Sequence, residues 1–266
     1  MSEAASVSEV IPRPPKLGRI GWSDVGTALR GGLGDLGRAP VYGLVFGLML
    51  AAAGVLAIVS VTWLDAGWLA VCIGVVFPLV FPFLTAGLYE VSRRLETGAP
   101  ITLGGLWSTV RSRSEIGWMA FVTVFIFIVW MYQVRFLMAL FLGLNASFSS
   151  LSEFMTVVLT TSEGLMFLGV GNIIGAMLAL TLFSLTVISF PLVLDRDVDI
   201  VTAMITSIRT VAASPMVMLG WAGVIGVLLL LSALPFFLGL VVTLPVLGHA
   251  TWHLYRRAIA PDTSVS

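Results

Sequence analysis

Long apolar stretches, separated by short polar ones, make up most of the chain from residue 41 onwards. A helix needs about 20 mostly apolar residues to cross the roughly 30 Å of hydrocarbon in a bilayer. Four stretches have this length and predict membrane-spanning helices at about residues 41–61, 68–88, 117–140 and 165–194. The stretch 216–254 is nearly twice as long as one crossing requires, so it predicts a hairpin of two spans. Pro235 is its expected break, because proline interrupts a helix.

Three amphipathic stretches come before the first, third and fifth spans: "WSDVGTALRGGLGDLGRAP", "ITLGGLWSTVRSRSEIG" and "DVDIVTAMITSIRTVAASP". Each begins with an expected N-cap, namely Ser23, Thr102 or Asp199. They predict helices in the membrane interface, or cytoplasmic helices packed over the ends of the spans. The expected fold is an all-α polytopic bundle of six transmembrane helices, arranged as three hairpins that each follow such a helix. In the last stretch, one face is expected to hold Ile200, Ala203, Met204, Ser207, Ile208 and Val211.

The composition excludes a soluble domain. Hydrophobic residues make up 58% and charged residues 11% of the chain, against roughly 45–50% and about 25% in soluble domains. The single cysteine, Cys72, excludes an intramolecular disulfide and CxxC pairs. Residues 1–19 lack the apolar core of a signal peptide, so we expect a disordered cytoplasmic tail there. A single six-span domain is expected over residues 20–259 and a short tail over 260–266.

The basic residues predict the orientation, because loops rich in Lys and Arg stay in the cytoplasm. With six spans, all fourteen lysines and arginines except Arg135 fall on one side of the membrane. Both termini are therefore expected in the cytoplasm, and the protein in a bacterial inner membrane. An odd number of spans would put Arg256 and Arg257 outside, so six is favoured over five or seven.

The second and sixth spans have similar sequences, "FPFLTAGLYEVSRRL" and "LPVLGHATWHLYRRA". Hairpins that all start from the cytoplasm would be parallel repeats about an axis along the membrane normal. The alignment pairs Pro82 with Pro245, Tyr89 with Trp252, and Arg93 and Arg94 with Arg256 and Arg257.

Four segments, "IGWSDVGTALRGGLGDL", "LTAGLYEVSRRLETG", "SFPLVLDRDV" and "LPVLGHATWHLYRRAI", are similar to a bacterial family of integral membrane proteins called domain of unknown function 2189. The resemblance extends from about Ile20 to Ile259 and implies no activity. Members are sometimes labelled cytochrome c oxidase subunit I. A catalytic haem-copper subunit needs several histidines on different helices, but this chain has two, His249 and His253, on one helix face. We therefore reject the catalytic reading and expect no cofactor.

The histidine pair has two interpretations, a metal site or an interfacial anchor. Histidines at i and i+4 can form half of a metal site, with Glu90 and Asp195 as the further ligands in reach. Aromatic residues and arginines surround the pair, which is typical of a membrane boundary. We therefore favour an interfacial anchor in which the histidines bind Glu90, a carbonyl or lipid headgroups. The flanking Arg93, Arg94, Arg256 and Arg257 are expected to mark the same boundary.

Two polar residues fall within other spans. Arg135 is expected near the outer interface, either as a boundary anchor or paired with Glu153 or Glu163. Asn172, in "GVGNIIG", is expected to bond across helices, and the glycines around it, like Gly43 and Gly47, to allow close helix packing. No acidic or basic residue is expected near the midplane, which disfavours a pump.

Three function classes remain. The first is a non-enzymatic scaffold, accessory or assembly subunit of a membrane complex, such as a respiratory one. The second is a passive channel or carrier for a small neutral or apolar solute. The third is a metal-binding membrane enzyme that uses His249 and His253. The expected partners are the lipid bilayer and other membrane subunits, with no nucleic acid.

Overall fold

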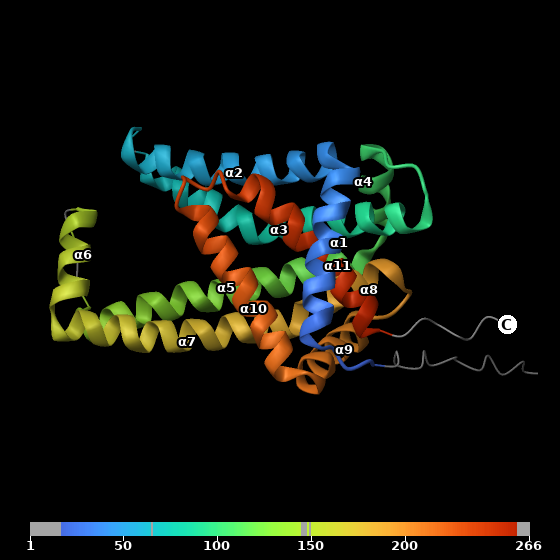
Figure 1. Ribbon diagram of the computed structural model, residues 1–266. Coiled ribbons are helices and arrows are strands. Elements are labelled where there is room, and N and C mark those ends of the chain that lie inside the picture. The colour runs from blue at the N-terminus through green and yellow to red at the C-terminus, as the bar shows by residue number, and fades with distance from the viewer. Residues whose placement is uncertain (1–16, 65, 145–147, 149, 260–266) are drawn as a thin grey trace, which may run out of the picture.

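The computed structural model describes residues 17–64, 66–144, 148 and 150–259, so the predicted tails at 1–16 and 260–266 lie outside the described residues. The described part is helical, apart from an isolated bridge between Leu17 and Ile259. Figure 1 shows the long helices running side by side between two ends of a bundle. These helices are α2 (Pro40–Thr62), α3 (Gly67–Thr97), α5 (Ser114–Phe141), α7 (Ser162–Thr186), α10 (Pro215–Ala233) and α11 (Leu240–Ala258).

Five helices of the described part are long and apolar enough to cross a membrane. These are α2, α3, α5, the α7–α8 unit Ser162–Asp195, and α10. The short helix α8 (Ser189–Asp195) continues α7 after a break at Val187 and Ile188. The first four predicted spans and the first arm of the hairpin are therefore confirmed as helices of spanning length. The sixth predicted span, α11, does not belong to this set.

The chain turns between α10 and α11 at residues 234–239, where the break at Pro235 was predicted. Phe236 and Phe237 have positive φ angles of 53° and 63°, which fit a tight turn and no helix. Helix α11 is less apolar than the others because its last ten residues include His249, His253, Arg256 and Arg257. It lies against α1, α2 and α3, and 13 of its 19 residues are buried. Contacts with protein can satisfy polar groups that lipid would leave unpaired.

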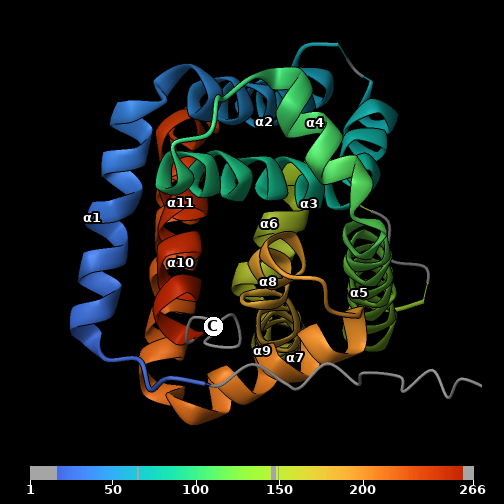
Figure 2. The ribbon, with the colours of Figure 1, turned by 90° about the vertical axis from the view of Figure 1, so that its right-hand side faces the viewer.

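Short helices lie across one end of the bundle. They are α1 (Trp22–Arg38), α4 (Leu103–Ser112) and α9 (Ile200–Ala213), and Figure 2 shows them around the ends of the long helices. Helix α6 (Leu151–Thr160) lies at the opposite end (Figure 1). The three helices predicted before the spans are therefore present. Thr102 and Asp199 cap α4 and α9 as predicted, but α1 begins after Gly21, so Ser23 is not its N-cap.

Five of the six residues predicted on the inner face of α9 are buried or pack against the core, and Ile208 is the exception. Ala203, Thr206, Ser207 and Thr210 are buried, whereas Ile208 is exposed. The hydroxyl of Ser207 accepts a hydrogen bond from the backbone N–H of Ile188, at the break between α7 and α8. The buried face therefore combines the predicted apolar contacts with polar groups, of which Ser207 satisfies the backbone at this break.

Glycines let α11 approach α1 and α2 closely. A Cβ added to Gly32 of α1 would lie 2.6 Å from the carbonyl oxygen of Val246, and one on Gly47 of α2 would lie 2.5 Å from that of Val241. Side chains at either position would push α11 away. The predicted packing role of Gly43 and Gly47 is confirmed, whereas a Cβ on Gly169 of α7 would meet no atom within 4 Å.

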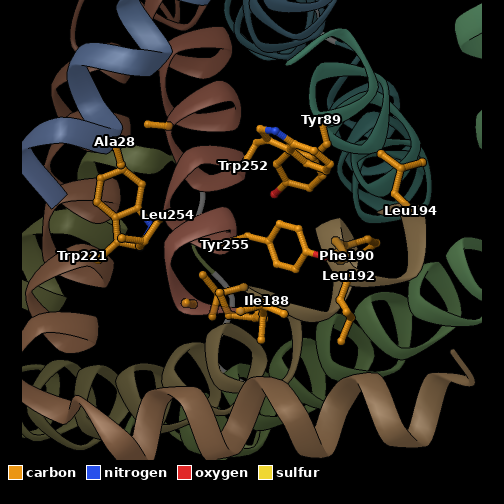
Figure 3. Packing of buried hydrophobic residues seen from close by; sticks show 14 of the residues in the cluster. Ala28, Tyr89, Ile188, Phe190, Leu192, Leu194, Trp221, Trp252, Leu254 and Tyr255 are labelled. Carbon is orange, nitrogen blue, oxygen red and sulfur yellow. The ribbon is translucent and has the colours of Figure 1, made fainter. Parts of the chain in front are cut away.

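Both ends of the described chain meet at the same end of the bundle. The backbone N–H of Gly18 donates to the carbonyl oxygen of Ala258 over 2.8 Å. The core beside this junction is aromatic, and Figure 3 shows Trp252 and Tyr255 of α11 extending toward α3 and α8. Trp221 of α10 and Ile188 are also fully buried in this core. The end of the bundle that carries the three short helices therefore holds a large core of fully buried side chains.

Candidate functional site

A buried ionic cluster joins α3 to α4. The side chain of Glu90 is 0% exposed, and it accepts from Nε of Arg93 at 2.6 Å and Nε of Arg94 at 2.7 Å. Arg94 also donates to the carbonyl oxygens of Pro100 and Gly105. A guanidinium group has five donors in a planar fork, so one arginine can bind the acid and the α4 backbone together.

The two histidines join α11 to its neighbours. Nδ1 of His249 lies 2.8 Å from the hydroxyl of Ser92 on α3. Nε2 of His253 lies 2.8 Å from the carboxylate of Asp35 on α1, and Nδ1 of the same ring lies 3.8 Å from Glu96. Ser92 and Glu96 are four residues apart, as are His249 and His253, so α3 and α11 run in the same direction here.

Asp35 is a buried carboxyl on α1 whose charged form is stabilised. Burial by itself would raise its pKa, but hydrogen bonds from His253 and Ser92 and the positive charge of His253 outweigh burial and lower the pKa below its usual value. The ionised form is therefore the one that binds α11.

The last turn of α11 binds acids on three other helices. Tyr255 donates to Asp195 of α8 over 2.7 Å, and Arg256 contacts the same carboxylate at 3.3 Å and Glu96 of α3 at 3.2 Å. Arg257 donates to Asp24 of α1 over 2.8 Å. The arginines predicted as boundary anchors thus form ion pairs with acids of the same chain.

The structure does not assemble the predicted metal ligands. Glu90 pairs with Arg93 and Arg94, which follow it by three and four residues on the same helix, so the predicted hydrogen bond from a histidine to Glu90 is wrong. His249 binds Ser92 of α3, whereas His253 binds Asp35 of α1. Within the part of the chain that the structure describes, no three His, Cys, Asp or Glu side chains group as metal ligands.

Arg135 and Asn172 are the polar residues that were predicted within other spans. Arg135 is exposed on α5, and Glu163, one of its two predicted partners, accepts a hydrogen bond from Ser162. The amide of Asn172 donates to the carbonyl oxygen of Leu168 in its own helix, so the predicted bond across helices is wrong. Asn172 is exposed because α7 turns that face away from its neighbours.

An apolar cavity of about 700 Å³ lies next to the ionic cluster, within the range of roughly 300–1,000 Å³ typical of ligand pockets. Helices α3, α5, α7, α8, α10 and α11 all contribute to its wall. It is partly open, and the exposed lining side chains Leu180 of α7 and Leu219 of α10 place the opening between these two helices.

The polar groups in the cavity wall are four threonines and Tyr89. Each threonine hydroxyl donates to a carbonyl oxygen of its own helix, as Thr251 does to Leu247. The hydroxyl of Tyr89 has no hydrogen-bond partner among the described residues, although the side chain is only 4% exposed. Figure 3 shows Tyr89 extending from α3 into the space beside Trp252 of α11.

The sequence reasoning missed Asp35, Ser92 and the role of Tyr89. Asp35 stands between glycines in an interfacial stretch, and its spacing from His253 carries no signal. Tyr89 directly precedes Glu90 at the end of an apolar run, which could have identified it as a boundary residue. The cavity has no signature in the sequence, because its wall comes from six helices.

Comparison with known proteins agrees with this helical, membrane-type architecture. Residues 69–195 match the family described as Predicted integral membrane protein (DUF2189). The predicted resemblance is thus confirmed from α3 to the end of α8, while the first and last segments that suggested it lie outside the match. Neither a curated protein nor a solved structure matches the chain.

Proposed function

We propose that the chain crosses a bacterial inner membrane six times, in three hairpins, with both termini in the cytoplasm. The hydrogen bond between Gly18 and Ala258 supports an even number of crossings, because five would leave the two ends on opposite sides. Helix α11 is then the sixth crossing, largely shielded from lipid by α1, α2 and α3. The arginines of α1, of α4 and of the last turns of α3 and α11 support the cytoplasmic assignment of this end.

Within that topology, we propose that the protein is a non-enzymatic binding protein or passive carrier for an apolar molecule taken from the bilayer. The cavity of about 700 Å³ carries this proposal, because its wall is almost wholly apolar and its opening lies between two spanning helices. The ionisable groups beside it bind one another, so they hold the helices in place and leave the cavity uncharged.

Photolabelling of the full-length protein in detergent with a diazirine-bearing hexadecane tests this proposal. Gly226 lines the cavity, and a Cβ added to it would meet no atom within 4 Å. Gly226→Leu should fill that space and reduce labelling of the lining peptides at least about fivefold. Gly223 lies on the same helix outside the cavity, so Gly223→Leu is the matched control. Equal labelling of both variants and the unaltered protein would refute cavity binding.

The second candidate is an accessory or assembly subunit of a membrane complex. The ion pairs that link α1, α3, α8 and α11 favour it, because they fix one end of the bundle as a rigid surface. On that end Trp22, Trp107 and Val201 of α1, α4 and α9 are exposed. A partner recovered at fixed stoichiometry from native membranes would support this role. Recovery of the chain alone, after crosslinking, would contradict it.

A further inference from the structure

We propose that the cavity binds an acyl-ester lipid of the surrounding bilayer, with an acyl chain among its apolar residues and an ester carbonyl accepting a hydrogen bond from the Tyr89 hydroxyl. This inference rests on the proposed binding function and adds the chemical class of the ligand and the residue that anchors it.

The hydrogen-bond donors of the cavity wall favour a ligand that carries an acceptor. The threonine hydroxyls already donate to their own helices, as Thr85 does to Phe81 and Thr186 to Leu182. Tyr89 therefore supplies the unused donor among the described lining residues. The Tyr89 hydroxyl is not among the sealed polar atoms of the described residues, so it faces the open space of the cavity, where a ligand carbonyl can accept from it. A pure hydrocarbon would leave the donor unsatisfied.

The position of Tyr89 along α3 fits an ester group. Glu90 follows it directly, and Arg93 and Arg94 follow it by four and five residues, so the tyrosine lies at the apolar edge of the ionic cluster, about 6 Å along the helix from the first arginine. This depth is the boundary between hydrocarbon and headgroups, where aromatic residues gather and the esters of lipids lie. The cavity extends from Tyr89 to Phe81, about 12 Å further along the helix, so an acyl chain would continue away from this boundary.

The opening of the cavity gives lipid direct access. It lies between α7 and α10, where Leu180 is 40% and Leu219 is 43% exposed. Both helices are long and apolar enough to span the membrane, so their outer faces meet acyl chains. The lining residues of these two helices include the small side chains of Ala179 and Ala222. A lipid can therefore enter sideways from the bilayer.

Two photoreactive probes of equal chain length separate the anchor from the cavity, namely a diazirine-bearing methyl palmitate and the diazirine-bearing hexadecane. Tyr89→Phe removes only the hydroxyl, and it should weaken labelling by the ester about fivefold while leaving labelling by the alkane unchanged. Tyr132→Phe, on an exposed tyrosine of α5, is the control and should change neither. Gly226→Leu should reduce labelling by both probes.

The outcomes distinguish the two proposals. If Gly226→Leu abolishes labelling but Tyr89→Phe has no effect on the ester, the cavity binds apolar chains and the ester anchor is refuted. If Gly226→Leu has no effect on either probe, the binding function itself is refuted. Competition with phosphatidylethanolamine and with decylubiquinone identifies the source of the carbonyl. Displacement by the quinone at much lower concentration than by the phospholipid would overturn the assignment to an acyl-ester lipid.

Discussion

Nε2 of His253 lies 2.8 Å from the carboxylate of Asp35, across 218 residues of sequence. This contact fastens the C-terminal helix α11 to the interfacial helix α1, close to the glycines that let the two helices touch. Each histidine ring is thus a link between helices. His249 binds α3 in the same way through Ser92.

Loss of the Asp35 charge should change stability in a pH-dependent way. Because the pKa of Asp35 is lowered from 3.8 in the folded protein, its contribution is fully present above about pH 4 and is lost as the pH falls through the folded value. Asp35→Asn should destabilise the protein by about 1–3 kcal/mol at pH 7 and reduce the loss of stability that occurs as the pH falls below about 4. Thermal unfolding in detergent at each pH measures both effects. Asp197→Asn, on a fully exposed acid, is the control.

Glu90→Gln should lower the free energy of unfolding more than the substitution of an exposed acidic residue does. The change leaves two partly buried guanidinium groups, those of Arg93 and Arg94, without their counter-charge. Breaking such a buried cluster costs about 3–5 kcal/mol. Urea unfolding should therefore shift strongly, whereas Glu163→Gln, at an exposed site, should stay within about 0.5 kcal/mol. If Glu90→Gln leaves the urea unfolding midpoint unchanged, the cluster does not hold α3 to α4.

Replacing Gly32 or Gly34 of α1 by alanine should change the stability of the protein in opposite directions. Gly32→Ala places a methyl group 2.6 Å from the Val246 carbonyl oxygen and should destabilise by about 1–3 kcal/mol through overpacking. Gly34→Ala meets no atom within 4 Å and should be neutral or stabilise by up to about 1 kcal/mol, because alanine favours helix. Apparent melting temperatures compare the two. Equal destabilisation would mean that α1 does not pack against α11 as described.

The six-span topology predicts which loops are periplasmic. A reporter that is active only in the periplasm should give signal when fused at Ala66 or near Pro235. Fusions near Thr97, at Asp199 and after Ala260 should give none. Signal from the fusion after Ala260 would mean an odd number of crossings and would remove the sixth span.

The sequence by itself determined the features that depend on local chemistry. Apolar length specified α2, α3, α5, the α7–α8 unit and α10, because hydrocarbon thickness and helix rise set that length. The hairpin turn near Pro235 followed from proline's missing N–H, and the caps Thr102 and Asp199 from their hydroxyl and carboxylate groups. Each of these properties is contained within a few consecutive residues or one helix.

Only the tertiary structure decided which polar groups face each other. Helical periodicity already places Glu90 beside Arg93 and Arg94 of its own helix. Packing alone brought Arg94 to the backbone of α4, and it alone paired His249 with Ser92 and His253 with Asp35. Packing also placed α11 among three helices, where most of its residues are buried against protein. Its polar residues lower the mean hydropathy of α11, so hydropathy alone does not identify it as a span. The cavity and the free hydroxyl of Tyr89 arise where six helices leave space between them, which no single segment encodes.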